Sequence, residues 1–386
     1  MLRKAADGGA AHHPGKFPRA VAEFGKHEHR ILVLQGGGAL GAYQAGVYDC
    51  LSEAGFGPDW VAGTSIGAIN AALICGNPPE HRVARLRGFW DRVSSQGPIA
   101  PLPTYLEAMR PLMNRMSAAG AAVFGVPGFY VPRTVPPALA QAGTMGALSY
   151  YDTEPLRETL NELVDFDLIN RHETRLSLGA ANVCTGEMVY FDNTTHTITA
   201  SHVMASGALP PGFPPVEIDG SYYWDGGLMS NTPLQYVAED LRLNALIVQV
   251  DLFSGTGPLP EDLHRVNERA KDIQYQSKQR FSYDRIKQVE SLRSTLAEVL
   301  EGLPADLLSN RNLDKLKEIS QRGAMTLVHL INRHDTQSSD VKDFEFSRAT
   351  VRDLWKFGHD DINHVLTDPS VCTITEFGNG VRAFDV

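Results

Sequence analysis

The sequence predicts an α/β protein with a mostly parallel central sheet and a helical C-terminal extension. Apolar runs typical of buried strands alternate with helical patterns along residues 30–250, as in parallel strands joined by crossover helices. Two successive strands within residues 31–70 each end in a glycine-rich turn that opens a helix. The composition, 43% hydrophobic and 21% charged over 386 residues, provides enough apolar side chains for a large core.

The first strand–turn–helix unit begins at residue 30. Arg30–Gln35 has the leucine and β-branched residues of a buried strand, and Gly36–Gly41 is a glycine-rich turn. The helix after it is predicted to end at Gly55, because glycine is common just after a helix. The apolar face of this helix is predicted to contain Tyr43, Val47, Leu51 and Ala54.

A second unit of the same kind follows. Trp60–Ala62 is predicted to be a short strand, Gly63–Gly67 its turn, and Ile66–Cys75 a helix of small residues that packs tightly. Residues 61–79 carry no charge over 19 positions. Their Gly, Ser, Thr, Asn and Pro residues nevertheless make them too polar for a membrane span.

Residues 97–148 differ in composition from their surroundings. Eight prolines fall between Pro98 and Pro137, interleaved with Met, Phe and Tyr, and charges are sparse. One interpretation is an irregular segment packed on the core. The other is a mobile apolar cap over Pro98–Tyr151, beside an active site.

Regular patterns return from Asp152 onward. In this part we expect a helix over Pro155–Leu163, strands over Leu176–Asn182, Met188–Phe191, Ser221–Trp224 and Ala245–Phe253, and a Pro/Gly loop over Ala205–Pro215. Beyond about residue 258 the composition shifts to charged helices. These are predicted over Glu261–Leu300, Asn312–Gln321 and Ser347–Leu366, around a strand at Thr326–Asn332.

Charge and cysteine usage limit the partners and the compartment. With 35 basic and 45 acidic residues the net charge is −10, which argues against nucleic acid but leaves room for a local lipid-binding patch. The first 28 residues lack the apolar core of a signal peptide. A cytoplasmic protein, with peripheral membrane attachment as a further option, is therefore expected. The cysteines form no C-x-x-C pair, which predicts free thiols and no metal site, and they are Cys50, Cys75, Cys184 and Cys372.

The turn at residues 63–67 has the pattern G-x-S-x-G. A serine on a sharp strand-to-helix turn is a nucleophile position, and Gly63 and Gly67 are needed because side chains there would collide with the strand or the helix. The strand before the turn and the helix after it favour this interpretation for Ser65. A glycine-rich turn with an incidental serine is the alternative.

The turn at residues 36–41 has three interpretations. A dinucleotide fingerprint over Gly36, Gly38 and Gly41 would need an acidic residue at the end of the next strand, where neither Glu53 nor Asp59 fits. A plain turn is the second interpretation. The third is an oxyanion cradle, in which the N–H groups of Gly37 and Gly38 face Ser65 on the neighbouring strand.

A general base must take the proton of Ser65. Downstream histidines are candidates for a Ser-His-Asp triad, namely His202, His329, His334, His359 and His364. His329 lies in an apolar run and is predicted to be a core residue, whereas His334 and His359 are predicted to be solvated. Asp225 follows an aromatic strand and precedes Gly226 and Gly227, although Asp-Gly unaided is more often a turn signal.

Taken together, these three segments resemble the patatin-like phospholipases in order and separation, over roughly residues 30–240. The resemblance implies a three-layer α/β hydrolase with a Ser–Asp dyad: Ser65 as nucleophile, Asp225 as general base, and Gly36, Gly37 and Gly38 as the oxyanion loop. The stretches 182–193 and 205–234 are also similar to that family. Many members have an arginine where this chain has Leu40. Residues 258–386 resemble the extension of a bacterial branch of the family.

The resemblance also implies a division of the chain and an activity. We expect a mobile leader over 1–28, a catalytic domain over 29–240, and over 241–386 a strand that completes the core with a mostly helical extension. The implied activity is calcium-independent hydrolysis of lipid esters, as a phospholipase A or lysophospholipase, through an acyl-Ser65 intermediate and without a cofactor. Met113, Met116, Phe124 and Phe129 would contact acyl chains.

Two other functions remain open at this point. The chain could be a catalytically silent protein that kept the fold and binds lipids or granules, although its motifs are complete. It could also be a serine protease-like enzyme with a histidine base. Reaction with a fluorophosphonate, compared between Ser65 and histidine variants, would separate the three.

Overall fold

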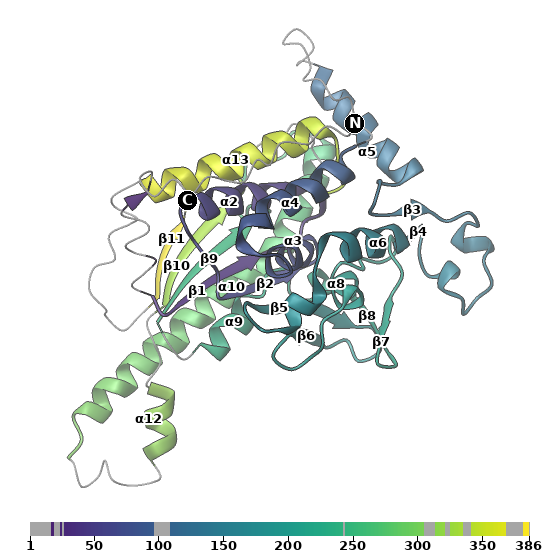
Figure 1. Cartoon of the computed structure of the whole chain (residues 1–386). Helices are drawn as coiled ribbons and strands as arrows, with labels where there is room; N and C mark the ends of the chain where they lie inside the picture. Colours follow the sequence, from purple (N-terminus) through teal and green to yellow (C-terminus); the bar gives the residue numbers. More distant parts are fainter. Residues whose placement is uncertain are drawn as a thin grey trace, which may run out of the picture.

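A computed structural model of the chain describes residues 17–18, 24, 27–95, 109–241, 244–304, 313–320, 325–334, 341–367 and 381–385. Its centre is a nine-stranded sheet with the strand order β11-β10-β9-β1-β2-β5-β8-β7, in which β6 pairs with β5 (Figure 1). The α/β class and the mostly parallel sheet are confirmed.

The strands fall into a parallel block and an antiparallel edge. The parallel block contains β11 (Val381–Asp385), β10 (Met325–Ile331), β9 (Ala245–Asp251), β1 (His29–Leu34), β2 (Trp60–Thr64) and β5 (Arg175–Asn182). The antiparallel edge contains β6 (Met188–Asp192), β7 (Val216–Ile218) and β8 (Ser221–Asp225). The functional segments lie where the two blocks meet, around β2, β5 and β8.

Helices cover both faces of the sheet, which gives three layers. Leu32 and Leu34 of β1 share one core with helices α2 (Gly41–Glu53), α3 (Ile66–Cys75), α4 (Pro79–Val93) and α13 (Arg348–Thr367). Ile31 and Val33 point to the other face, toward α9 (Leu234–Asp240) and α10 (Leu263–Glu301). Because successive side chains of β1 point to opposite faces of the sheet, this strand contributes to both cores.

Helix α2 is buried more completely than its sequence indicates. We predicted a single apolar face, but every residue from Gly41 to Leu51 is buried. The sheet covers one side of α2, and α13 from the C-terminal region packs along another, which Figure 1 shows. Gly46 allows this close contact, because a Cβ there would lie 1.9 Å from the Trp355 carbonyl oxygen.

The C-terminal region adds strands as well as helices. The predicted strand over Thr326–Asn332 is present as β10, and β11 follows it in the same parallel sheet. Helix α12 (Asp314–Ser320) also lies in a predicted helical stretch. The division of the chain at residue 241 stays a prediction.

Residues 109–152 contain a helix in the stretch for which an irregular segment was one of our two interpretations. Helix α5 (Arg110–Phe124) begins with a proline in its first turn, where the missing N–H has no partner to lose. A short ribbon of β3 (Val131–Pro132) and β4 (Tyr151–Asp152) follows, and Figure 1 shows this region projecting from the main body. Residues 97–108 of the predicted cap lie outside the described residues.

Three further helices follow residues 109–152 in the chain. Helix α6 (Glu154–Leu163) matches its prediction closely, and α7 (Phe166–Asn170) follows it. Helix α8 (Ala200–Ser206) was not predicted, and its last residues overlap the start of the predicted Pro/Gly loop. Its capping box uses His202 instead of the usual Glu or Gln, which hid the helix start from sequence reasoning.

Most of the predicted leader lies outside the described residues. Phe17 and Phe24 are described and buried in the core, with the ring of Phe24 5.2 Å from that of Phe56. Cys50 and Cys75 are buried free thiols and Cys184 is an exposed one, whereas Cys372 lies outside the description. Among the described helices, none combines the length and the apolar character that a bilayer span requires.

Candidate active site

Ser65 lies on a strained turn between β2 and α3. Its backbone has φ 57° and ψ −123°, in the left-handed region that costs free energy for any residue except glycine. A Cβ at Gly63 would lie 2.3 Å from the carbonyl oxygen of Gly67, and a Cβ at Gly67 would lie 2.3 Å from that of Leu34. Both flanking positions therefore require glycine, as the motif predicts.

Helix α8 supports the turn from behind. The amide of Ser65 donates to the carbonyl oxygen of Ser206 (3.1 Å) and to its Oγ (3.0 Å). The Ser206 hydroxyl in turn donates to the carbonyl oxygen of Gly179 in β5 (2.6 Å). Sequence reasoning missed Ser206, because nothing local marks a serine that acts from another helix.

The register of three strands brings Asp225 to Ser65. Thr64 pairs with Gly179 across β2 and β5, and Ala180 pairs with Asp225 across β5 and β8. Gly179 leaves room for the Thr64 side chain of the neighbouring strand, because a Cβ there would lie 3.0 Å from Thr64 Oγ1. This register places the Ser65 hydroxyl beside the Asp225 carboxylate.

The environment of Asp225 suits a base. The residue is 2% exposed, and burial raises the pKa of its carboxyl to about 6, against the lowering effect of hydrogen bonds from Ser65 and the Gly227 amide. The Gly227 amide donates to Asp225 Oδ1 at 2.7 Å. Gly226 lets the chain approach β5, since a Cβ there would lie 2.5 Å from the Gly179 carbonyl oxygen.

The three glycines of the loop after β1 have different roles. The amide of Gly36 donates to the carbonyl oxygen of Asn231 (3.0 Å), and Asn231 Nδ2 donates back to the Gly36 carbonyl oxygen (2.9 Å). The Gly36 amide is therefore occupied within the loop, and the oxyanion role of the three glycines stays a prediction. Gly37 and Gly38 donate no backbone hydrogen bond to any residue that the structure describes.

The C-terminal region holds this loop in place. Gly38 has φ 57°, and a Cβ there would lie 2.0 Å from the Asp343 carbonyl oxygen. That same oxygen accepts a hydrogen bond from the Ala39 amide (2.8 Å). Asp343 Oδ1 pairs with Lys271 Nζ of α10 at 2.8 Å. A segment some 300 residues away in sequence thus fixes the conformation of the glycine loop.

A cavity of about 410 Å³ opens beside Ser65 and Asp225. Its walls are mostly apolar and come from the whole chain, and they include the aromatic rings of Phe129, Tyr130, Tyr151, Phe213, Phe253, Tyr275, Phe344 and Phe346. The last three belong to the C-terminal region, which sequence reasoning did not connect with the site. The rings pack edge to face around Phe129, whose centroid lies 5.8 Å from those of Phe213 and Phe346.

One of the four predicted acyl-contact residues lines the cavity, and the acyl contacts themselves stay a prediction. Phe129 is buried and lines the cavity. Met113, Met116 and Phe124 are not among the cavity-lining residues, and Met116 and Phe124 point to solvent. The reason is that they lie in α5, most of which projects away from the cavity.

The five candidate histidines are engaged elsewhere. His202 is buried in the capping box of α8, and burial lowers its pKa. His329 contacts the buried Asp251, as expected of a core histidine. His334, predicted to be solvated, is exposed and contacts Asp361, whereas His359, also predicted to be solvated, is half-buried and contacts Glu53, and His364 is exposed. None of these five lines the cavity at Ser65.

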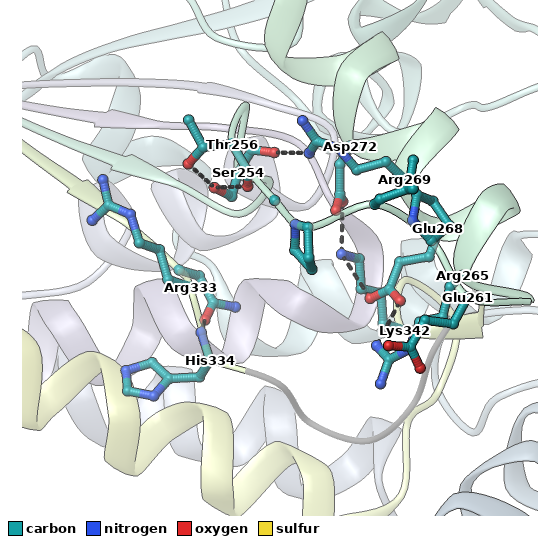
Figure 2. A pocket seen from close by; sticks show the side chains of 15 residues that line it. Ser254, Thr256, Glu261, Arg265, Glu268, Arg269, Asp272, Arg333, His334 and Lys342 are labelled. Atoms are coloured by element: carbon teal, nitrogen blue, oxygen red, sulfur yellow. Dashed lines mark hydrogen bonds and ion pairs between the residues drawn. The ribbon is translucent and has the colours of Figure 1, made fainter.

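A second, polar pocket of about 470 Å³ lies between the end of β9, helix α10, residues 332–334 and Lys342. Figure 2 shows Lys342 between two carboxylates of α10, with its Nζ 2.6 Å from Asp272 and 3.3 Å from Glu268. Arg269 donates to the Ser254 carbonyl oxygen (2.9 Å). These contacts tie α10 to the segment that carries Asp343, next to the catalytic cavity.

One group of side chains in the described part of the chain could hold a metal ion. The ligand atoms of Cys50, Glu53 and His359 lie within 4.8 Å of one another at the interface of α2 and α13. His359 Nε2 already contacts Glu53 Oε1 at 3.4 Å. None of the three lines the cavity at Ser65.

Comparisons with known proteins show limited similarity to individual proteins. Lysophospholipase nte1 of Aspergillus terreus is 60% identical over 42 residues, which are 11% of this chain and 3% of that protein. The crystal structure of VipD from Legionella pneumophila shares 17% identity and covers 86% of this chain and 67% of its own, with a TM-score of 0.34. The type III effector ExoU shares 15% identity over 88% of this chain and 54% of its own, with a TM-score of 0.29.

Family models match much more of the chain. A model described as a patatin-like phospholipase matches residues 32–238, which contain Ser65, Asp225 and the glycine loop. A second model, described as a patatin phospholipase, matches residues 273–374 and includes Asp343, Phe344 and Phe346. The chain is therefore a member of the patatin-like phospholipase family.

Proposed function

We propose that this protein is a serine lipid acyl hydrolase of the phospholipase A or lysophospholipase type, with Ser65 as nucleophile and Asp225 as general base. The position of the Ser65 hydroxyl beside the buried Asp225 carboxylate supports this most directly. It places a nucleophile on a strained turn next to a base, at a cavity with apolar walls. A lipid ester as substrate follows from the family.

The proton has a defined route in this mechanism. Ser65 Oγ attacks the ester carbonyl carbon while its proton moves to Asp225, and the tetrahedral intermediate then expels the alcohol, which takes that proton. Water then attacks the carbonyl carbon of the acyl-Ser65 ester while one of its protons moves to Asp225. The second tetrahedral intermediate expels Ser65 Oγ, which takes that proton, and the free acid leaves. A carboxylate with a pKa of about 6 is a better base than an exposed aspartate, and it is still ionised at neutral pH.

Backbone amides would stabilise the oxyanion. We assign this role to the Gly37 and Gly38 amides, which line the cavity, and to the N-terminus of α3 directly after Ser65. Such donors contribute about 3–4 kcal/mol each to transition-state stabilisation in comparable sites. Gly36 serves the loop instead, through its two hydrogen bonds with Asn231.

The dyad and the amides supply the nucleophile, the base and the oxyanion donors. Every charge that develops in acyl transfer thus has a partner in the protein, and calcium independence is part of the proposal. The cavity walls suit an acyl chain, since aromatic side chains offer a large apolar area. A cytoplasmic location stays a prediction.

The test is labelling and turnover of the Ser65→Ala variant. We expect it to lose fluorophosphonate labelling and hydrolysis of a p-nitrophenyl ester, while its circular dichroism spectrum stays that of the wild type. Ser254→Ala is the matched control, because Ser254 lines the neighbouring polar pocket. Turnover retained by purified Ser65→Ala would contradict the proposal, and a wild type that neither reacts nor hydrolyses would favour a silent lipid-binding protein.

A further inference from the structure

Helix α5 exposes apolar side chains in an unusual concentration. Leu112, Met116, Val123 and Phe124, here called the α5 face, are 53%, 66%, 62% and 71% exposed. Further exposed apolar side chains follow in the next loop, at Val131, Val135, Leu139, Met145, Leu148 and Tyr150. A concentration of exposed apolar side chains in one segment marks an interaction site more often than scattered single residues do.

The polarity of α5 is inverted for a helix of a globular protein. At about 100° per residue, Leu112, Met116 and Val123 fall within roughly 40° of one another. The buried residues Asn114 and Ala118 lie on the opposite side of the helix. The side that packs on the protein is thus small or polar, and the side that faces outward is apolar.

This surface adjoins the catalytic cavity. Ala122 of α5 lines the cavity, and its carbonyl oxygen accepts a hydrogen bond from the Tyr151 hydroxyl at 2.8 Å. Tyr151, Phe129 and Tyr130 line the cavity as well. An acyl chain that leaves a bilayer at the α5 face would therefore meet the cavity walls directly.

The charge of the surrounding segment is opposite to that of the whole chain. Residues 109–150 contain three arginines and no aspartate, glutamate or lysine, whereas the chain has a net charge of −10. Arg115 is exposed on α5, on the flank of the α5 face. Arg110 and Arg133 are paired with Asp353 and Asp152, so the positive charge beside the apolar surface comes from Arg115, which favours contact with anionic phospholipid.

We propose that the α5 face docks on an anionic phospholipid bilayer, with Met116 and Phe124 inserted among the acyl chains and Arg115 near the headgroups. This deepens the proposed function, because docking there would place the cavity opening at the lipid surface. The chemistry at Ser65 does not depend on it.

Vesicle binding by catalytically inactive protein tests the docking separately. We would measure sedimentation of Ser65→Ala protein with vesicles of phosphatidylcholine, alone or mixed with phosphatidylglycerol. Adding Met116→Gln and Phe124→Gln should lower the partition coefficient on the mixed vesicles at least about tenfold, or about 1.4 kcal/mol. Adding Arg115→Glu instead should weaken binding by about tenfold on the mixed vesicles and little on neutral ones.

The matched control changes equally exposed apolar residues elsewhere. Leu263→Gln with Leu292→Gln alters two side chains of α10 that are 79% and 71% exposed, and should leave binding unchanged. Undiminished binding of the Met116/Phe124 variant, or no binding by Ser65→Ala protein, would overturn the docking proposal. So would a wild-type dimer that the Met116/Phe124 variant dissociates. Ester hydrolysis retained by Ser65→Ala would instead overturn the proposed function.

Discussion

Asp225 and Asp251 are two buried aspartates, each the last residue of a strand of the same sheet, and their partners differ. Asp225 ends β8, lies beside the Ser65 hydroxyl and accepts a hydrogen bond from the Gly227 amide. Asp251 ends β9 and contacts His329, with Gln249 Nε2 at 3.1 Å from both of its oxygens.

The two aspartates show that a histidine–aspartate pair can lie in the same sheet as the nucleophile without contacting it. Asp251 with His329 has the composition of two members of a triad, yet Ser65 lies beside Asp225. Neither Asp251 nor His329 lines the catalytic cavity. The presence of a His–Asp pair in a hydrolase therefore says little about catalysis until a nucleophile is shown to contact it. We assign Asp251 and His329 a structural role.

Exchanging each aspartate for asparagine gives the largest expected difference. Asp225→Asn should lower kcat/KM for a soluble ester by about 10³- to 10⁴-fold, because an amide cannot accept the serine proton. Asp251→Asn, the matched control, should retain activity of the order of the wild type. A folded Asp251→Asn variant as inactive as Asp225→Asn would show that the His–Asp pair takes part in catalysis.

The pH dependence sharpens the comparison through Asp225. Its pKa is raised to about 6, so kcat/KM should be constant above that pH and fall about tenfold per pH unit below it. A pH–rate profile on a soluble ester measures this. A profile that shows no ionisation between pH 5 and about 7 would contradict the assignment of Asp225 as the base.

The raised pKa of Asp225, which makes its carboxylate a better base, also lowers the stability of the fold at neutral pH. The folded pKa lies above the ordinary value of 3.8, so the ionised carboxylate destabilises the fold by about 3 kcal/mol above pH 6. This penalty develops between pH 4 and about 6 and is absent below that range. Chemical unfolding of Asp225→Asn should therefore show a gain in stability at pH 7 that disappears near pH 4.

His329→Ala should affect stability and spare activity. Removing the ring leaves the Asp251 carboxylate buried without this partner, at an expected cost of about 2–4 kcal/mol in the free energy of unfolding. His364→Ala is the control, because that side chain is exposed on α13. Stability equal to the wild type would remove the structural role that we assign to the pair, and a selective loss of activity would make it catalytic.

The smallest expected effect concerns calcium. Hydrolysis of a soluble ester should be the same in EDTA and in calcium, because the dyad and the backbone amides account for acyl transfer. The assay uses purified protein dialysed against EDTA. Activity that is lost in EDTA and returns with calcium would mean that a metal ion takes part.

Local sequence determined the nucleophile turn and the elements around it. Helix α3 has the predicted bounds, Ile66–Cys75, and Gly63 and Gly67 are required by contacts within a few ångströms of Ser65. Such features depend on backbone geometry and apolar periodicity over a few residues, and these are written in the sequence itself. The assignment of Asp225 needed more, since an Asp-Gly pair is ambiguous until a family resemblance resolves it.

Tertiary structure decided which residues, distant in sequence, lie beside the nucleophile turn and the glycine loop. The register of β2, β5 and β8 brings Asp225 to Ser65, and Asn231 occupies the Gly36 amide. Asp343 holds the glycine loop, and α5 turns Met116 and Phe124 away from the cavity. These contacts join residues that are up to 300 positions apart, and their free energy depends on the packing of whole layers. No local pattern encodes that packing, because it exists only once the sheet has formed.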